Sequence, residues 1–429
     1  MSIQILPGTS VTVKAGERAA EFVPQGIVAM PFALNWGDTV TVINSGDDTL
    51  YSLGYKRSDY TGAGMKLVAE VLHSADKLIL YRSNIDSGVK ATGTLATGIT
   101  ATAKYVGTRG NDITVTVTAS GSNWIIKTLV GTTEVDSQTV ADEANFVAND
   151  FITITGSGTL AAASVKLANG ANGTPRATEA DLWLAEMEKY TFNVLAYCGS
   201  TAGTIMAIRA FVADQRSKNN MIQAVMSGVA ADNLAIYNCT VGGVTEDYTL
   251  TALEACATLA GIIAKQGITG SLTHYQISWW TDVGTKLTRE QQETAVQAGQ
   301  LIVALIYGVP TVVYDINSLV TYTDDAPKDF HKGLIVRTLD NFAMNLQMLL
   351  DTKCIGKIRR SVDGKAQIKA MINTLTVTSY LNNDYIQNFT ADDIMITDGT
   401  DTDDIITTVM VQPVDTVDKI AVTVVSLAA

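Results

Sequence analysis

Residues 178–197 read TEADLWLAEMEKYTFNVLAY and change from one periodicity to another within a short stretch. Thr178 and Asp181 resemble a capping box, and the apolar spacing after them predicts a helix over residues 179–190. Residues 192–197 are mostly apolar and predict a short buried strand. A helix that leads directly into a buried strand is typical of a sheet covered by helices on both faces. This stretch therefore predicts a layered α/β fold.

The alternation of helices and strands continues on both sides of this stretch. On the N-terminal side, residues 65–73 have helical spacing and residues 77–81 predict a buried strand. Toward the C-terminus, Thr288 and Gln291 form a further capping pair. The elements expected there are a helix at 202–215, a strand near 222–226, a helix at 249–265, a helix from Thr288 to about Tyr307 and a central strand at 311–315.

Residues 91–175 have a different composition, rich in threonine and glycine. β-Branched residues alternate with polar ones in ITVTVT (113–118), WIIKT (124–128) and FITIT (151–155). Turns of Gly, Asn and Ser separate these runs. The pattern is typical of a small antiparallel sandwich or barrel, so we expect an all-β domain inserted into the α/β core.

The chain is expected to consist of six segments around this layered α/β core. The C-terminal region combines helices near 340–350 and 364–381 with strand-like pieces at 405–412 and 419–427, which indicates an α+β domain. The six segments are an N-terminal linking arm (1–20), the first part of the core (21–90), the inserted β-sandwich (91–175), the α/β core domain (176–320), the α+β C-terminal domain (321–414) and a C-terminal linking strand (415–429).

Composition excludes several classes of function. The chain has 429 residues, a net charge of −13 and a pI near 4.7. Nucleic acid is therefore not expected as a partner, because a protein must neutralise phosphates to bind them. The most apolar stretch, residues 301–313, is interrupted by Gly308 and Pro310 and is too short to span a bilayer, so we expect no membrane insertion. The four cysteines form no CxxC pair and are expected to be free thiols of a reducing compartment.

Against this acidic background, residues 353–369 form a basic segment with six basic side chains and one acid, Asp363. Residues 384–418 then contain nine aspartates and no lysine or arginine. A patch of one sign beside a field of the other favours oriented docking on a charged partner, although a solvated basic helix face would look the same. The six candidate contact residues are Lys353, Lys357, Arg359, Arg360, Lys365 and Lys369.

Both ends of the chain carry strand-like sequence with no hairpin partner nearby. Residues 10–14 alternate like a strand between turn residues, and residues 419–427 do the same after Pro413. Because open strand edges recruit other chains, the two ends are candidates for strand exchange between neighbouring subunits. The candidate linking residues are Val11, Thr12 and Val13 at one end and Lys419, Ile420, Val422, Val424 and Val425 at the other.

The motifs of common enzymes are absent or incomplete. The loop CGSTAG (198–203) opens a helix after a core strand, but it has neither G-x-G-x-x-G spacing nor the lysine of a P-loop. The three histidines are not at metal-ligand spacing. DGTDTDD (398–404) fails the EF-hand pattern, since no glutamate occupies the twelfth position. We expect no catalytic, cofactor or metal site, and a nucleotide-binding α/β enzyme with a β accessory domain is the alternative.

The adjacent pair Trp279-Trp280 is unusual. If this segment is a strand, the two rings point to opposite faces. One ring then belongs to the core, and the other is a candidate anchor for an interface.

Several blocks, in this order along the chain, resemble the tail sheath proteins of contractile phages and of phage-tail-like bacteriocins. Near the N-terminus they are PGTSVTVKAG and QGIVAMPFALNWG, and in the inserted domain AKYVGTRGNDITVTV. The core ends with LTREQQETAVQAGQLIVALIYGVPTVVYDINSLVTY. The C-terminal region carries KDFHKGLIVRTLDNFAMNLQMLL, VDGKAQIKAMI and VMVQPVDTVDKIAVTVVSL. The resemblance thus covers most of the chain.

The resemblance implies a structural machine with no enzymatic activity. Subunits of such sheaths are expected to form hexameric rings stacked helically around an inner tail tube, and to contract when a baseplate triggers them. The terminal arms would link neighbouring subunits, the C-terminal domain with its basic segment would face the tube, and the inserted domain would lie outside. Expected partners are other copies, the tube protein, and baseplate and tail terminator proteins. Assembly is expected in the cytoplasm of the producing bacterium, before release as part of a virion or bacteriocin particle. Another tail or baseplate component is the structural alternative.

Overall fold

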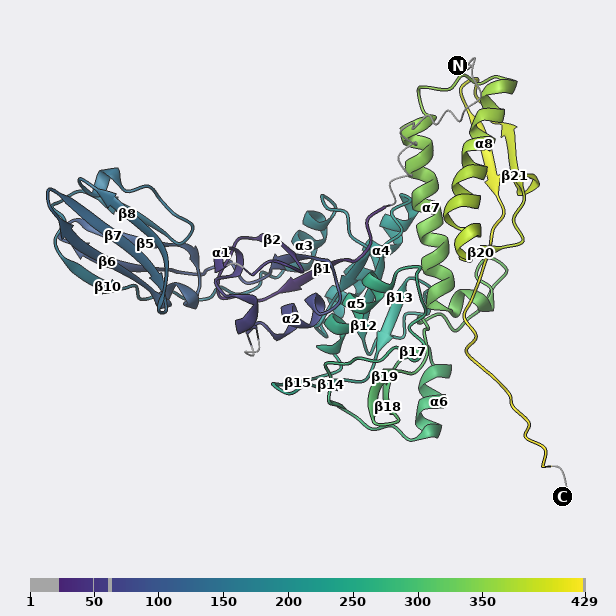
Figure 1. Cartoon of the computed structure of the whole chain (residues 1–429), viewed down its shortest axis with the longest axis horizontal. Coiled ribbons are helices and arrows are strands. Elements are labelled where there is room, and N and C mark those ends of the chain that lie inside the picture. Colours follow the sequence, from purple (N-terminus) through teal and green to yellow (C-terminus); the bar gives the residue numbers. More distant parts are fainter. Residues whose placement is uncertain (1–22, 49, 61–63, 427–429) are drawn as a thin grey trace, which may run out of the picture. The chain divides into compact units, whose positions relative to one another are not determined.

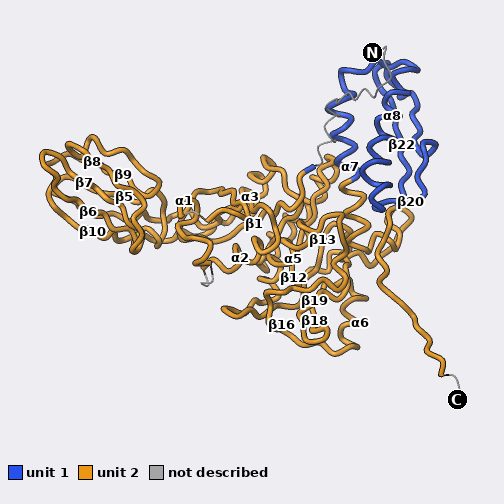
Figure 2. The backbone as a smooth tube through the Cα atoms, in the orientation of Figure 1, with its two compact units in different colours: residues 1–23, 342–412 blue, residues 24–341, 413–429 orange. Residues whose placement is uncertain are grey.

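The computed structural model describes residues 23–48, 50–60 and 64–426. The chain divides into two compact units (Figure 2). Of the described residues, the smaller unit comprises Val23 and residues 342–412. The larger unit comprises residues 24–341 and 413–429, and it contains both the α/β core and the inserted β domain (Figure 1).

The core of the larger unit is a seven-stranded sheet with the order β17-β13-β12-β11-β1-β3-β2. All neighbouring strands run parallel except β2, which is an antiparallel edge strand beside β3. The predicted α/β class is therefore confirmed. The strands are β1 (Ile27–Phe32), β2 (Val40–Asn44), β3 (Lys77–Arg82), β11 (Val194–Ala196), β12 (Gln223–Ser227), β13 (Ile236–Cys239) and β17 (Gln300–Leu301).

Helices cover both faces of this sheet, because successive strand residues point to opposite sides. On β1, Val28 and Met30 belong to the hydrophobic cluster that contains α2 and α5, while Ile27 and Ala29 belong to the cluster that contains α3 and α4. The near-continuous apolar sequence of the inner strands follows from burial on both faces. The four helices are α2 (Lys66–Leu72), α5 (Ala255–Gln266), α3 (Glu179–Met187) and α4 (Ala202–Ser217).

The helix predicted from Thr288 to about Tyr307 begins correctly but ends early. Thr288 and Gln291 form the predicted capping box at the start of α6 (Arg289–Gln297). The helix stops there because Gly299, just past its end, has a φ of 70°, a left-handed conformation that ends helices. The prediction of a helix over the following residues is wrong.

The central strand predicted at 311–315 is also wrong. Thr311 and Val312 do lie in a strand, but it is β19 (Val309–Val312), which forms a two-stranded hairpin with the preceding β18 (Val303–Ile306) and only an isolated bridge, from Thr311 to Gln276, on its other side. Tyr307 and Gly308 join the two strands with φ values of 51° and 85°. Two central residues with positive φ make the tight turn that suits the twist of a hairpin.

The inserted domain is an antiparallel sandwich of two sheets, with the orders β10-β6-β7-β8 and β4-β5-β9. The three predicted alternating runs lie in β6, β7 and β9. Alternate residues of β6 (Ile113, Val115 and Val117) are buried between the sheets, as the period of two requires. The strands are β4 (Lys90–Ala96), β5 (Ile99–Val106), β6 (Ile113–Ser120), β7 (Asn123–Val130), β8 (Thr133–Val140), β9 (Ile152–Gly156) and β10 (Ala163–Lys166).

A tryptophan from outside the insertion completes the sandwich core. Trp36 lies in the loop between β1 and β2, yet it is 1% exposed within the hydrophobic cluster of the sandwich. Its ring stacks on Phe151 at 6.0 Å between centroids and meets Tyr105 edge-on at 5.3 Å. The inserted domain and the α/β core therefore share part of one hydrophobic core.

Arg82, at the end of β3, ties the same two parts together through backbone carbonyls. Its guanidinium donates to the oxygen of Gly37 at 2.8 Å and to that of Val106 at 2.9 Å. No described carboxylate pairs with it, and burial lowers the pKa of Arg82 to about 10. Such a buried cation is tolerated because carbonyl dipoles replace part of its hydration.

The prediction that Trp279 and Trp280 point to opposite faces of a strand is wrong. Both indole N–H groups donate to the carboxylate of Glu70 on α2, at 3.0 and 3.1 Å. Glu70 is fully buried and also accepts hydrogen bonds from the hydroxyls of Tyr248 (2.9 Å) and Thr258 (2.6 Å). The two adjacent indoles together supply hydrogen bonds to one buried carboxylate. Without such partners, that carboxylate would be costly to bury.

The smaller unit is built from two helices and a β-hairpin. α7 (Gly333–Lys353) begins in the larger unit and ends in the smaller one, and α8 (Val362–Ser379) begins at Ser361, whose side chain accepts from the backbone of Gly364 at 3.0 Å. The hairpin pairs β21 (Ile394–Asp398) with β22 (Ile405–Val409). The remaining elements of the chain are short: α1 (Leu50–Leu53), β14 (Gly243–Val244), β15 (Thr249–Leu250), β16 (Asp282–Val283), β20 (Ile386–Gln387) and β23 (Gln412–Pro413).

Replacing Trp36 by alanine is expected to lower the free energy of unfolding by about 3–5 kcal/mol, since it leaves a large cavity in the sandwich core. Denaturant titration followed by circular dichroism measures this change. Val147→Ala is the matched control, because Val147 lies in the same domain but is 71% exposed, and it should change stability by less than about 0.5 kcal/mol. Equal effects of the two variants would contradict the assignment of Trp36 to the sandwich core.

Candidate functional site

The basic segment, residues 353–369, covers the end of α7, the turn after it and the first turns of α8. Lys353, Lys357, Arg359 and Arg360 are exposed there, while Lys365 and Lys369 are half-buried. The same turn exposes two aliphatic side chains. Ile355 is 69% and Val362 is 81% exposed. Cations around exposed apolar side chains form a surface suited to docking.

Two of the six cations already have an acidic partner within the smaller unit. Arg360 and Lys365 both pair with Asp398 at the end of β21, at 3.0 and 3.1 Å. The hydrogen bond from Lys365, together with the charge of Arg360, lowers the pKa of Asp398. The acidic region that follows the basic segment in sequence therefore folds back to neutralise part of it.

The other four cations of the basic segment are free of ion pairs with the residues that the structure describes. Lys357 donates to the backbone oxygen of Thr352, in the last turn of α7. Lys353, Arg359 and Lys369 keep their positive charge available to a partner. The contact role of the six side chains stays a prediction, and Lys353 and Arg359 are the two that are both exposed and unpaired in the described chain.

The C-terminal arm, residues 415–429, has a strand-forming sequence but forms no strand over its described part, up to residue 426. Ile420, Val422, Val424 and Val425 are 74–89% exposed. β-Branched side chains stabilise a strand when they pack on the surface of a sheet, and they give little stabilisation when they are exposed to water. Four of them in an extended and solvated segment indicate a strand that lacks its sheet.

Lys332 holds the start of this arm against the larger unit. Its ammonium group pairs with Asp415 at 3.1 Å and with Asp418, and it lies 4.4 Å from the centre of the Tyr314 ring. Lys332 is only 8% exposed. Lys419 lies over the same ring at 5.8 Å. The arm is therefore fixed up to about residue 419 and free beyond it.

Sequence reasoning missed this clamp, although the sequence contains a signal for it. Asp415 and Asp418 are spaced three residues apart and are the only acidic residues after residue 404. The linking residues predicted at the other end of the chain, Val11, Thr12 and Val13, lie outside the described residues.

Two further ion pairs fix the beginning of α7 within the larger unit. Arg337 pairs with Asp315 at 2.7 Å, and these side chains are 5% and 0% exposed. Burial by itself lowers the pKa of Arg337, but the charge of Asp315 raises it. The net effect is a raised pKa. One turn further on, Arg216 of α4 forms a two-pronged pair with Asp340, at 2.7 and 2.8 Å. Paired and hydrogen-bonded in this way, buried charges are tolerated, whereas one left alone would not be.

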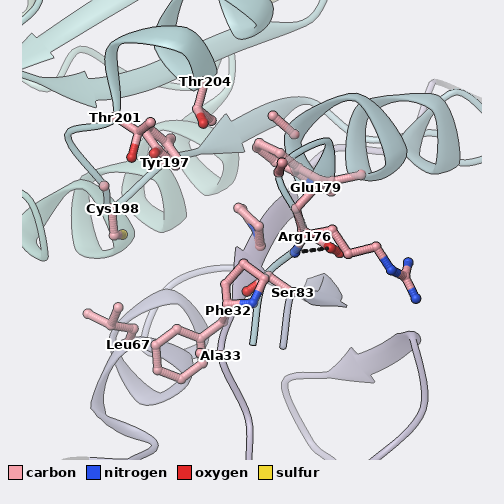
Figure 3. A pocket seen from close by; sticks show the side chains of 16 residues that line it. Phe32, Ala33, Leu67, Ser83, Arg176, Glu179, Tyr197, Cys198, Thr201 and Thr204 are labelled. Carbon is pink, nitrogen blue, oxygen red and sulfur yellow. Dashed lines mark hydrogen bonds between the residues drawn. The ribbon is translucent and has the colours of Figure 1, made fainter. Parts of the chain in front are cut away.

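A cavity of about 520 Å³ lies at the position where a doubly wound sheet would hold a ligand. β1 and β11 are neighbours, and the chain leaves them in opposite directions along the sheet. Figure 3 shows the cavity between Phe32, at the end of β1, and Tyr197, Cys198 and Thr201, after β11. The loop 198–203 therefore lies where the nucleotide-binding alternative requires it.

The lining of this cavity does not suit a nucleotide. Arg176 is the single basic residue in it, and its guanidinium pairs with Asp86 at 3.2 Å. In Figure 3 the guanidinium points away from the other labelled side chains. Thr201 caps α4 without a side-chain hydrogen bond, and burial raises the pKa of the Cys198 thiol to about 12, which disfavours its reactive thiolate form. Phosphates bound here would meet no free cation among the described lining residues.

The described part of the chain contains no group of three or more His, Cys, Asp or Glu side chains that could hold a metal ion. The segment 398–404 is the turn between β21 and β22, closed by a bond from the Gly399 amide to the oxygen of Asp404. Burial lowers the pKa values of His73 and His331. Among the described helices, none has the length and apolar character needed to cross a bilayer.

Comparison with known protein families accounts for nearly the whole chain. Four family models match in sequence. They are the tail sheath protein Gp18 domain III N-terminal region (residues 25–82), the phage tail sheath protein beta-sandwich domain (86–172), the phage tail sheath protein central domain (171–318) and the phage tail sheath C-terminal domain (325–426).

Individual relatives agree with these models. The chain is 30% identical to the phage-like element PBSX protein XkdK of Bacillus subtilis (strain 168), over 92% of this chain and 91% of that one. It is 30% identical to a sheath tail protein from Desulfitobacterium hafniense of known crystal structure, with a TM-score of 0.83 over 96% and 97% of the two chains. The helical sheath of the anti-feeding prophage, solved in its contracted state, shares the fold at a TM-score of 0.58 and 10% identity, over 99% of both chains.

The matched family models and the shared fold identify a structural protein of a phage-type tail. The chain belongs to the phage tail sheath protein family. The family resemblance seen in the sequence is thereby confirmed. The matched family models and the two solved structures named above are of tail sheath proteins.

Replacing Lys332 by methionine is expected to release the start of the C-terminal arm, because it leaves Asp415 and Asp418 without their cation. Hydrogen bonds to charged groups contribute about 1.5–3 kcal/mol, so trypsin should cleave after Lys419 at least about tenfold faster. Mass spectrometry of a cleavage time course measures the rate. Lys328→Met removes an exposed cation from the same region and should leave the rate unchanged. A rate equal to wild type in Lys332→Met would show that the clamp does not hold the arm.

Proposed function

We propose that this chain is the subunit of a contractile tail sheath, which polymerises as hexameric rings stacked helically around an inner tube. Contraction of the sheath drives the tube through the envelope of a target cell. The observation that carries the proposal is the C-terminal arm, which is clamped at its root and exposes a run of unpaired β-branched residues. In a chain of this family, such a segment is explained by a sheet in a neighbouring subunit.

Strand exchange supplies the links between subunits. An added strand binds mainly through backbone hydrogen bonds, which form with little regard to sequence and survive changes in the angle between subunits. The two-stranded hairpin β21–β22 has open edges within the described chain and is a suitable acceptor. Residues 11–13 would add a second strand from another neighbour. Links of this kind let the lattice rearrange during contraction without coming apart.

The basic segment is proposed to hold the sheath on the tube in its extended state. Each partly exposed ion pair contributes only about 0–1 kcal/mol, so one subunit binds weakly. A sheath presents the segment many times on a single tube, and this repetition makes the sum strong. Because each contact between the basic segment and the tube is weak, a trigger at one end can release the sheath from the tube ring by ring. Larger contacts between subunits then favour the contracted packing, with no nucleotide required.

The remaining parts of the chain take positions that follow from this arrangement. The inserted sandwich, with few charges and turns rich in glycine, is proposed to face outward. Baseplate and tail terminator proteins would cap the two ends of the sheath. Assembly would take place in the cytoplasm of the producing bacterium, followed by release as part of a virion or a bacteriocin-like particle. The shared fold of a sheath solved in a contracted state supports the contractile role.

Truncation of the chain after Lys419 is expected to abolish polymerisation and to leave the fold of the monomer intact. The cut keeps Asp415 and Asp418 on Lys332 and removes only the exposed strand. Sedimentation and negative-stain microscopy measure polymerisation, and circular dichroism checks the fold.

A pair of point variants tests whether backbone pairing by the arm, and not merely the presence of the segment, is needed for assembly. Val422→Pro removes a backbone donor and should weaken assembly, whereas Val422→Thr keeps the β-branched shape and should assemble like the wild type. Normal polymers formed by the truncated chain would contradict strand exchange through this arm.

Reversing charge at Lys353 and Arg359, both to glutamate, is expected to prevent coassembly with the tube while sheath-only polymers persist. These two residues have no ion pair in the described chain, so Asp398 keeps both of its partners. We expect a loss of about 1–2 kcal/mol per subunit at low salt, multiplied along the tube. Cosedimentation with purified tube measures the change.

The matched control for this reversal is Lys90→Glu with Lys166→Glu, which makes the same change in net charge on the inserted domain. Both lysines are exposed and carry no ion pair with another described residue. The control should bind the tube like the wild type. Equal loss of tube binding in the two double variants would mean that net charge, and not the basic segment, governs the contact.

A further inference from the structure

The β18–β19 hairpin ends in a fully exposed tyrosine. Tyr307 is the first residue of the two-residue turn, and no part of its side chain is covered. Its hydroxyl makes no hydrogen bond with any described residue. Such a side chain contributes nothing to the stability of the isolated chain.

The backbone at this position argues against tyrosine on structural grounds. Tyr307 has a φ of 51°, and the following Gly308 has a φ of 85°. A tight hairpin turn with two positive φ values strongly prefers asparagine or glycine at its first position, and a bulky residue there is strained. Tyrosine is thus placed where it gains no burial and where the turn disfavours it. Residues kept in strained positions commonly serve a contact or a mechanism.

The base of the hairpin presents this tip firmly. Val303 and Val312 are 1% and 0% exposed, so the two strands are anchored in the core. The backbone of β19 is also bound on its outer side, by hydrogen bonds from the amide of Ile277 to Pro310 and from that of His274 to Val312, at 2.9 and 2.8 Å. A rigid base lowers the entropy cost of docking the tip.

The hairpin itself carries no charge and exposes apolar area beside its tip. Residues 301–314 contain no charged side chain, and Leu305 beside the tip is 36% exposed. Copies of a chain with a net charge of −13 repel one another at long range. Contacts between copies are therefore most favourable where charge is absent and apolar area can be buried, and this hairpin meets both conditions.

We propose that Tyr307 is an aromatic anchor that inserts into a second copy of this chain. Tyrosine is among the residues that most often dominate binding energy at interfaces. A protruding finger that enters a different surface of its partner is compatible with a head-to-tail contact, the kind that builds the helical polymers of the proposed sheath. The inference rests on the proposed sheath function and adds to it a lateral contact that is independent of the terminal arms.

The test is Tyr307→Asn in the full-length chain. Asparagine suits the turn better than tyrosine, so the melting temperature should stay the same or rise by about 1–3 °C. Polymerisation should nevertheless weaken, with the critical concentration for assembly at least about tenfold higher than in the wild type. Light scattering over a concentration series measures assembly, and differential scanning calorimetry measures the melting temperature. Because the two readouts are expected to differ in direction, misfolding cannot imitate the result.

Tyr307→Phe is the matched variant, since it keeps the ring and removes the hydroxyl. It should assemble within about threefold of the wild type if ring burial carries the contact. Wild-type assembly by Tyr307→Asn would overturn the anchor and leave the sheath function untouched. A wild-type chain that never polymerises would contradict the sheath function itself, and the anchor with it.

Discussion

The buried ion pair between Arg337 and Asp315 is the interaction on which the rest of this molecule depends. It joins the first turns of α7 to the segment that follows the β18–β19 hairpin. Arg337 also donates to the Tyr237 hydroxyl of β13 at 3.0 Å. Losing one partner of such a pair would strand a buried charge at a cost of about 3–5 kcal/mol, so α7 is held firmly where it begins. Lys332, only a turn earlier, fixes the arm, and the far end of α7 carries the basic segment. One short stretch of chain thus holds both the beginning of α7 and the root of the C-terminal arm.

A second constraint is the negative charge of the whole chain. Copies that repel at long range associate only through short-range contacts, which here are apolar side chains and unpaired strands. We propose that the exposed β-branched residues of the arm and the Tyr307 tip provide such contacts between copies, while Ile355 and Val362 belong to the surface proposed to face the tube. Each is attached to an element that the fold holds in place. A polymer built from several modest contacts of this kind can exchange one set for another, as the proposed contraction requires.

The sequence predicts those parts of the fold that depend on local periodicity. The sandwich strands alternate with a period of two, and the capping pair Thr288 and Gln291 marks the start of α6. What it fails to predict depends on distant partners or on single backbone conformations. α6 ends early because of the left-handed Gly299, and the Trp279-Trp280 pair is explained only by Glu70, which is more than two hundred residues away in sequence. Similarly, the basic segment is visible from composition, but the pairing of Arg360 and Lys365 with Asp398 requires the hairpin to fold back.

The central claim is that an assembly of this chain stores free energy in the contacts between its copies. Negative-stain electron microscopy of the purified full-length protein, with and without the tube protein over a range of concentrations, tests it most directly. The account predicts rings or hollow helical polymers of uniform diameter that form without nucleotide. A monodisperse monomer at high concentration, unchanged by addition of the tube, would contradict it.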